Sequence, residues 1–327
     1  MKVLGMGNAL VDIITRLEDD KLLKTFGLPK GSMTLVDFET SNFINSETAG
    51  LLKQKASGGS AANTIHGLAH LGVDTGFIGM VGNDDLGTFF YKDMRNKNIK
   101  PILFKSVTET GRAVALISPD SERTFATYLG AAVELSTEDL NSSIFKGYDY
   151  LYIEGYLVQD NQLIEKAVRL AKKRGLKVCV DLASYNIVEE HKSVFHALLE
   201  EGVDIVFANN MEAEALTGEK PEKAVRILGE SVDIAVVKTG AEGSLVFSDG
   251  ELTRIGVRPS NPIDTTGAGD MYSAGFLYGL INGQSMEICG KIGAILAGRV
   301  IEVYGAKMDE SVWENLRREI KSLLVVP

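Results

Sequence analysis

The segment Asp264-Thr265-Thr266-Gly267-Ala268-Gly269-Asp270 places two carboxylates around small residues, directly before the apolar run MYSAGFLYGLI. The run predicts a buried helix, whose first backbone N–H groups are unpaired and carry a partial positive charge. Glycines at such a helix start let an anion approach the backbone closely. A carboxylate beside that anion would repel it, so the presence of Asp270 there requires a functional reason. Accepting the proton of an attacking hydroxyl is such a reason, and the segment therefore predicts phosphoryl transfer.

A second glycine motif supports this interpretation. An isolated Gly-x-Gly-Asp is also explained by a capped helix whose glycines serve packing. However, Gly58-Gly59-Ser60-Ala61-Ala62-Asn63 opens another helical segment, TIHGLAHLG. The two motifs, in this order and at this separation, resemble the signatures of the PfkB, or ribokinase-like, carbohydrate and nucleoside kinases. The resemblance covers essentially the whole chain, and it implies an ATP-dependent kinase with a doubly wound α/β fold and a small β-sheet lid.

The resemblance implies roles for the C-terminal motif. Asp270 is the catalytic base, and backbone N–H groups form an anion hole for the transferring phosphate. These N–H groups belong to Gly267, Ala268 and Gly269. The family's monovalent-cation site corresponds to three further positions, which adds K⁺ to the expected cofactors. They are Asp264, the carbonyl of Thr266 and the turn at Gly305.

Two motifs resemble the family's Mg²⁺ and nucleotide sites. Asn209-Asn210-Met211-Glu212 fits an N-x-x-E motif, in which Asn209 and Glu212 would hold Mg²⁺ through water molecules, although a helix cap explains the asparagine equally well. Lys238-Thr239-Gly240-Ala241-Glu242-Gly243 resembles a nucleotide loop, and a simple β-turn would have the same composition. Ala294 and Ala297 could leave room for the adenine ring or serve helix packing.

The acceptor site is expected at the N-terminal glycine motif. The residues assigned to it are Asn8, Asp12, Gly58, Gly59 and Asn63. A carboxylate can accept from two neighbouring hydroxyls, which suits Asp12 to a vicinal diol, whereas a turn cap is the alternative. Arg123 is expected to reach the closed site from the lid and to pair with phosphate, or else to be a solvated lid arginine.

The choice of acceptor rests on segment similarity. GLPKGSMTLVD, SGGSAANTIHGLAHLG and ERTFATYLG look like bacterial adenosine-kinase-type members. We therefore expect adenosine, phosphorylated at its 5′-hydroxyl, with its base in an apolar slot of the lid. The slot would comprise Met33, Leu35 and either Phe125 or Tyr128. The alternative is a sugar kinase of the ribokinase, fructokinase or ketodeoxygluconate-kinase type. A non-catalytic sugar or nucleotide sensor is disfavoured because Asp270 and the glycines are all present.

The elements that must position these residues alternate along the chain. Short runs rich in Val, Ile and Tyr predict strands of one parallel sheet, and helical periods between them predict helices on both faces. The runs are KVLGMG, TGFIGMVG, YDYLYIEG, LKVCVDL, VDIVFAN and IAVVKTG. In such sheets ligands bind beyond the carboxyl ends of the strands. Segments 13–38 and 100–128 break the rhythm and predict the lid, so residues 1–327 form one domain plus this lid.

Composition excludes several other classes of protein. A net charge of −10 argues against nucleic-acid binding, and no apolar run reaches the length of a membrane span. The N-terminus lacks the pattern of a signal peptide, so a cytoplasmic location is expected, as monomer or lid-mediated homodimer. Cys179 and Cys289 are expected to be buried free thiols, and the histidines lack partners for a zinc site. No P-loop motif occurs, and Gly5-Met6-Gly7 lacks the third glycine of a dinucleotide-binding fingerprint.

Overall fold

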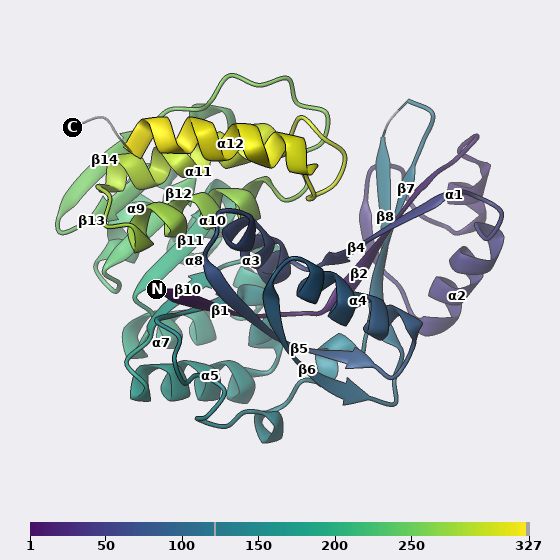
Figure 1. Cartoon of the computed structure of the whole chain (residues 1–327), viewed down its shortest axis with the longest axis horizontal. Helices are drawn as coiled ribbons and strands as arrows, with labels where there is room; N and C mark the ends of the chain where they lie inside the picture. The colour runs from purple at the N-terminus through teal and green to yellow at the C-terminus, as the bar shows by residue number, and fades with distance from the viewer. Residues whose placement is uncertain (121, 325–327) are drawn as a thin grey trace.

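Two β-sheets organise the chain in the computed structural model, which describes residues 1–120 and 122–324 (Figure 1). The larger sheet has nine strands in the described residues, in the order β14-β13-β12-β11-β10-β9-β1-β5-β6. Their bounds are β1 Lys2–Met6, β5 Asp74–Gly82, β6 Ile99–Ser106, β9 Tyr150–Glu154, β10 Lys177–Asp181, β11 Ile205–Asn209, β12 Ile234–Lys238, β13 Ser244–Ser248 and β14 Glu251–Ile255. All neighbours from β6 to β12 pair in parallel, and β13 and β14 extend the sheet antiparallel. The predicted doubly wound, mostly parallel α/β fold is confirmed.

Helices cover both faces of the large sheet because its strands alternate buried side chains between two cores. Val3 and Leu4, adjacent on β1, belong to different hydrophobic clusters. One face is covered by α3 Ser60–His70, α4 Asp85–Asn96, α10 Ala268–Ile281, α11 Met286–Val300 and α12 Glu310–Leu324. The other is covered by α5 Asn161–Lys173, α6 Tyr185–Glu190, α7 Lys192–Glu201, α8 Asn210–Thr217 and α9 Pro221–Gly229.

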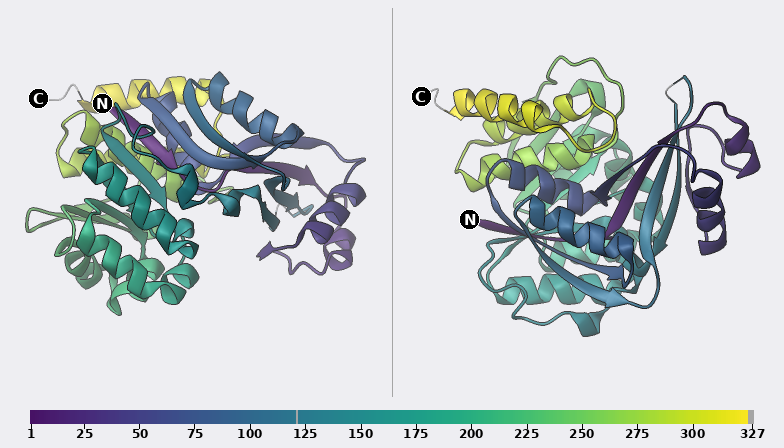
Figure 2. Two further views of the ribbon diagram at one scale, coloured as in Figure 1. Left: turned by 90° about the horizontal axis from the view of Figure 1, so that it is seen from below. Right: turned by 45° about the vertical axis from the view of Figure 1, so that its right-hand side comes forward.

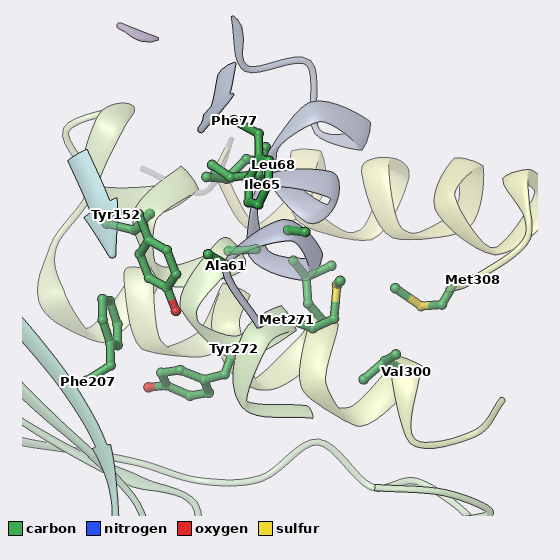
Figure 3. Close-up of a cluster of buried hydrophobic side chains, with 14 of the residues drawn as sticks. Ala61, Ile65, Leu68, Phe77, Tyr152, Phe207, Met271, Tyr272, Val300 and Met308 are labelled. Carbon is green, nitrogen blue, oxygen red and sulfur yellow. The ribbon is translucent and has the colours of Figure 1, made fainter. Parts of the chain in front are cut away.

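Helices α3 and α10 pack closely, and this contact brings the two glycine motifs together. A Cβ atom at Gly67 would lie 2.7 Å from the Cβ of Ala274, so the close approach requires glycine at that position. Figure 3 shows Ile65 and Leu68 of α3 and Met271 of α10 within one buried cluster. As a consequence, the residues that open α3 lie next to those that open α10.

A five-stranded sheet stands beside the larger one, as Figure 2 shows, in the order β3-β8-β7-β2-β4. Its strands are β2 Leu10–Arg16, β3 Met33–Leu35, β4 Lys53–Gly58, β7 Thr110–Ile117 and β8 Arg123–Gly130. The short helices α1 Lys21–Thr25 and α2 Phe38–Glu47 are part of the same unit. The sequence-based boundaries need correction here, because β4 lies outside both predicted lid segments. In addition, residues 100–106 belong to β6, which pairs with β5 in the large sheet. This strand is a sheet edge, which explains its polar alternation and its tolerance of Pro101.

Strand register divides the small sheet into two faces. Side chains that are directly opposite on neighbouring strands share a face, and successive residues alternate. Asp12 on β2 is opposite Ala113 on β7. Ala113 is opposite Thr127 on β8, and Thr127 is opposite Leu35 on the edge strand β3. We call this the inner face. Its side chains include Asp12, Ile14, Arg16, Met33, Leu35, Arg123 and Phe125.

Tyr128 lies on the opposite, outer face of the small sheet. It is paired with Arg112, which in turn is opposite Val11. Its ring lies 5.8 Å from that of Phe38 at the start of α2, and the Arg112 guanidinium lies 5.3 Å from its centroid. Of the two aromatic residues expected to line an apolar slot, only Phe125 is therefore on the face that carries Asp12.

Several smaller predictions are also resolved. Cys179 and Cys289 are free and buried. Trp313 packs the C-terminal helix onto the body with a side chain 2% exposed, and its ring stacks on that of His70 at 4.6 Å. No helix in residues 1–120 and 122–324 combines the length and apolarity needed to cross a bilayer.

Candidate active site

Asp270 is held by hydrogen bonds from the helix that carries the other glycine motif. The hydroxyl of Ser60 donates to Oδ1 at 2.8 Å, and Nδ2 of Asn63 donates to Oδ2 at 2.9 Å. Burial raises the pKa of Asp270 to about 6, and the bonds from Asn63 and Ser60 partly oppose that rise. The carboxylate is therefore fixed in orientation and remains ionised at neutral pH, as a general base must be.

Lys307 joins this arrangement, although the sequence analysis did not find it. Its ammonium group donates to Oδ1 of Asn63 at 3.0 Å, which fixes the amide so that Nδ2 faces Asp270. Burial lowers the pKa of Lys307 to about 8, and the negative charge of Asp12 opposes this effect. The only sequence signal for Lys307 is its place directly after the turn that contains Gly305.

Asp12 faces the same group of residues from the inner face of the small sheet. Burial raises the pKa of this carboxyl to about 6, Lys307 lowers it, and Asp270 raises it further. A Cβ atom at Gly58 would lie 2.2 Å from Oδ1 of Asp12, so only glycine leaves room for the carboxylate there. The structure thus places Gly58 against Asp12 and links Asn63 to Lys307, whose charge acts on Asp12.

Asn8 and Gly59 complete this group. Gly59 has φ +98°, and a Cβ atom there would meet the carbonyl oxygen of Asn8 at 2.2 Å. The side-chain oxygen Oδ1 of Asn8 is buried without a hydrogen-bond partner among the described residues. Such an atom is costly unless a ligand satisfies it, which favours a polar acceptor here.

Glu154 supports the loops on either side and was missed by the sequence analysis. Its two carboxylate oxygens accept the backbone N–H groups of Asn8 at 2.8 Å and Ala61 at 2.9 Å. Burial raises its pKa to about 7 against the effect of these bonds. Glu154 is the last residue of β9, so its place at the carboxyl end of a predicted strand was the available signal.

The start of α10 has the form expected of an anion site. Gly267 precedes the helix with φ +77°, in the left-handed region that glycine adopts readily. The N–H of Ala268 donates to the carbonyl of Thr265 at 3.2 Å, so this predicted anion-hole donor is already engaged. A Cβ atom at Gly269 would lie 3.2 Å from Nζ of Lys238, which places an ammonium group beside the helix start.

Lys238 and Asp181 form a buried ion pair at the carboxyl ends of β12 and β10, the two strands that flank β11. Nζ of Lys238 lies 2.8 Å from Oδ2 of Asp181, which also accepts from Ser273 at 3.3 Å. Burial alone would lower the pKa of Lys238, but Asp181 and Glu212 raise it above its usual value. Asp181 ends β10 and was not singled out in the sequence, although the strand rule that applies to Glu154 applies here too.

Asn209 and Glu212 bond to each other. The side chain of Asn209 accepts the N–H of Glu212 at 2.9 Å, and Glu212 accepts the N–H of Asn209 at 2.7 Å, which is a capping box at the start of α8. Burial, and next the charge of Asp181, raise the pKa of Glu212 to about 7. No group of three His, Cys, Asp or Glu side chains in the described residues could hold a metal ion alone. Both oxygens of Glu212 accept N–H groups of Asn209, so Glu212 and Asp181 would act on Mg²⁺ through its water ligands.

The predicted nucleotide loop is the turn of a β-hairpin. The N–H of Thr239 donates to the carbonyl of Gly243 at 2.8 Å, and the turn joins β12 to the antiparallel β13. Gly240 and Gly243 have φ +62° and +96°. Ala294 and Ala297 are half-buried on α11 and pack against the hydrophobic core. Their role in nucleotide binding remains a prediction.

Arg123 and Asp264 form a buried ion pair between the small sheet and the loop before α10. Arg123 is therefore not a solvated lid residue. Its guanidinium also lies 5.1 Å from the ring centroid of Tyr304. Gly305 donates its backbone N–H to Oδ2 of Asp264 at 2.6 Å. The carboxylate of the expected monovalent-cation site is thus already paired with the guanidinium of Arg123.

A separate cavity of about 390 Å³ lies away from these residues. Its lining includes Asn42 of α2 and Arg112, whose side chain lies on the outer face of the small sheet. Arg112 is fully engaged there by Ser41, Asn42 and Glu109. The convergent polar groups around Asp270 therefore define the candidate active site better than cavity size does.

Comparison with known proteins agrees with this geometry. Residues 35–312 match the model of the pfkB family of carbohydrate kinases. A 5-dehydro-2-deoxygluconokinase from Bacillus licheniformis is 30% identical over 268 residues, which cover 77% of this chain and 82% of that protein. Among solved structures, a probable sugar kinase from Rhizobium etli is 33% identical with a TM-score of 0.87, covering 99% of both chains. An adenosine kinase from Sinorhizobium meliloti is 36% identical with a TM-score of 0.86, covering 97% of this chain and 99% of that one.

These relatives bear on the two acceptors expected from the sequence. The curated relatives favour the sugar-kinase alternative over adenosine, whereas the solved structures include relatives of both kinds. All of them are kinases. The chain therefore belongs to the pfkB family of carbohydrate kinases, and it is a phosphotransferase whose acceptor is a sugar or nucleoside hydroxyl group.

Proposed function

We propose that the chain transfers the γ-phosphate of ATP to a hydroxymethyl group, with Asp270 as the general base. The observation that carries the proposal is the Asp270 carboxylate, fixed by Ser60 and Asn63 at the N-terminus of α10. The acceptor O–H bond breaks as Asp270 takes the proton, and the acceptor oxygen forms a bond to the γ-phosphorus. The bond from the γ-phosphorus to the bridging oxygen breaks, and ADP leaves.

Charge stabilisation at the phosphate is assigned to the residues around the helix start. We assign this role to the N–H groups of Gly267 and Gly269 at the start of α10, and to the ammonium group of Lys238 beside Gly269. Arg123 supports the same assignment because its Nε and Nη2 atoms are buried without partners among the described residues. Phosphate oxygens would satisfy both donors. Glu212, with Asp181, is proposed to hold Mg²⁺ through water.

For the acceptor we propose a nucleoside, with adenosine first. Asp12 would accept both ring hydroxyls of the ribosyl group, beside Asn63 and the backbone of Gly59. The inner face supports this choice because Met33 and Leu35 are 58% and 60% exposed there, and Phe125 of β8 is directly opposite Met33. A flat apolar base would cover these side chains, whereas a free sugar would leave them exposed to solvent.

A sugar or sugar acid is the second candidate, and two observations favour it. The curated relatives are 5-dehydro-2-deoxygluconokinases. Lys307 places a buried ammonium group beside Asn63 and Asp12, and such a group could receive an anionic or hydroxyl-rich acceptor. In this case the exposed apolar side chains of the inner face would play no part in recognition.

One assay separates the candidates. Initial rates of ADP release are measured with MgATP against adenosine, 2′-deoxyadenosine, ribose, fructose and 5-dehydro-2-deoxygluconate. The nucleoside proposal expects the highest kcat/KM for adenosine and a large loss for 2′-deoxyadenosine, because a buried oxygen of Asp12 then loses its donor. A preference for the sugar acid or a free sugar favours the second candidate. No turnover with any acceptor would contradict the proposed reaction itself.

The setting of the enzyme is also part of the proposal. An enzyme that consumes ATP to modify small metabolites would work in the cytoplasm, where ATP is available. The small sheet has an exposed edge strand, β3, whose apolar side chains could be covered in a homodimer, or the chain acts as a monomer.

A further inference from the structure

We infer that the guanidinium of Arg123 occupies the position at Asp264 that the family resemblance gives to a monovalent cation. The chain would then work without one. This inference rests on the proposed function only for the activity part of its test. It starts from the contacts of a single carboxylate, which lies in the loop directly before the proposed anion site.

Within the described part of the chain, the Asp264 carboxylate accepts hydrogen bonds at both of its oxygen atoms. Oδ1 accepts the N–H of Thr266 at 3.0 Å and its hydroxyl at 2.8 Å. Oδ2 accepts Nη1 of Arg123 and the N–H of Gly305 at 2.6 Å. A cation such as K⁺ needs several oxygen ligands whose lone pairs face it. Here both carboxylate oxygens already accept from N–H and O–H groups, so a metal ion could be bound by the carboxylate only if it displaced these donors.

The charge that a cation would supply is supplied by the protein. Arg123 and Asp264 are each 9% exposed, and a carboxylate this deeply buried requires a compensating positive charge. The guanidinium is held in place from a second side, since the ring of Tyr304 lies 5.1 Å away. Arg123 comes from β8 and is therefore tethered, whereas a free ion would have to bind from solution.

Neutralising Asp264 matters for the proposed reaction because of its position. Asp264 stands three residues before Gly267, the residue that directly precedes α10. An uncompensated carboxylate there would weaken the positive potential of the helix start and repel a phosphate. Arg123 therefore acts as a positioning residue that keeps the loop ordered and its potential positive.

The inference is tested by thermal unfolding without substrate or ATP, in KCl, NaCl and choline chloride at equal ionic strength. The wild-type protein should have the same Tm in all three salts. Arg123→Gln removes the guanidinium charge and exposes the Asp264 carboxylate to solvent ions. Its Tm should be lower in choline chloride and should rise with KCl in a saturable manner, as expected for a bound ligand. The double variant Arg123→Gln/Asp264→Asn should lose this response.

Arg16→Gln is the matched control. Arg16 also lies on the inner face, and its guanidinium is 5.2 Å from the same Tyr304 ring. Because Arg16 is not among the donors to Asp264, this variant should remain indifferent to K⁺. If Arg123→Gln folds only in KCl, that rescue is also the expected result.

Two outcomes would overturn the inference. One is a wild-type Tm that is higher in KCl than in choline chloride at the same ionic strength. The other is an Arg123→Gln protein that does not respond to K⁺, whether it is folded or unfolded in all three salts. The activity part compares wild-type turnover in KCl and choline chloride, which should be equal. Absence of turnover with every acceptor would contradict the proposed function, while the Tm measurements would still decide this inference.

Discussion

Asn63 donates its side-chain N–H to Oδ2 of Asp270 at 2.9 Å, although 207 residues separate the two in the chain. The contact exists because α3 and α10 pack closely enough to exclude a side chain at Gly67. Asn63 belongs to the glycine motif that is assigned to the acceptor, so this hydrogen bond connects the candidate base with the proposed acceptor site. The predictions below begin from this contact.

Replacement of Asp270 tests its role as a base. Asp270→Asn keeps the shape of the side chain but cannot accept the acceptor's proton, so kcat should fall by at least about 100-fold. Binding of ATP and acceptor, measured by calorimetry, should change little. Asp249→Asn is the control, because Asp249 is an exposed carboxylate in the turn between β13 and β14. Turnover near the wild-type level in Asp270→Asn would contradict the assignment.

The pH dependence of the reaction should follow the ionisation of Asp270. Its pKa is raised to about 6 by burial, so activity should be lost as the pH falls through about 6 and should level off above it. The hydroxyl of Ser60 lowers that pKa, so Ser60→Ala should move the acidic limb of the profile to higher pH. Ser60→Thr retains a hydroxyl and is the control. The profiles are measured as kcat against pH, and coincident limbs for wild type and Ser60→Ala would exclude Asp270 as the titrating group.

Lys307→Met should weaken acceptor binding more than it slows chemistry. The ammonium lowers the pKa of Asp12, so its loss should raise that pKa above about 6 and leave part of Asp12 protonated at pH 7. We expect the acceptor KM to rise by about 10-fold or more, as for a lost charged hydrogen bond, and to recover in part at pH 8.5. Lys321→Met, on the exposed side of α12, is the control. A KM that does not depend on pH in Lys307→Met would contradict the proposed coupling.

The two faces of the small sheet allow a direct test of the nucleoside proposal. Phe125→Ala removes an apolar side chain from the face that carries Asp12, and the KM for adenosine should rise by about 10-fold, whereas the KM for ribose should not change. Tyr128→Ala removes an aromatic ring of similar size from the outer face, so it should affect stability without this substrate selectivity. Equal effects of Phe125→Ala on adenosine and ribose would favour a sugar acceptor.

Capping and metal binding at α8 can be separated by two substitutions. Asn209→Ala removes the side chain that caps the helix and should lower the free energy of unfolding by about 1 kcal/mol. Glu212→Gln can still complete a capping box but loses the charge. It should therefore retain stability in urea unfolding and raise the Mg²⁺ concentration needed for half-maximal activity. An unchanged Mg²⁺ requirement in Glu212→Gln would leave Glu212 with the capping role alone.

Local patterns were sufficient for much of the fold. Each short Val- and Ile-rich run that was predicted to be a strand appears in the large sheet, because strands buried on both faces require such runs. These strands are β1, β5, β9, β10, β11 and β12. Motif spacing was likewise sufficient to identify the glycine segments that open α3 and α10. Glu154 and Asp181 could have been found by the same kind of reasoning, because each is a carboxylate near the end of a predicted run and is the final residue of the observed strand.

The tertiary structure decided the features that depend on partners distant in the chain. An edge strand and a strand of a small exposed sheet have similar polar alternation, so only hydrogen bonding to β5 assigns residues 99–106 to the large sheet. Register alone separates Phe125 from Tyr128, since each residue along a strand changes face. The sequence by itself determined that Asp270 stands at a glycine-rich helix start. Its contact with Asn63, and that of Asp264 with Arg123, come from docked elements far apart in sequence, because such contacts depend on packing rather than on local residue pattern.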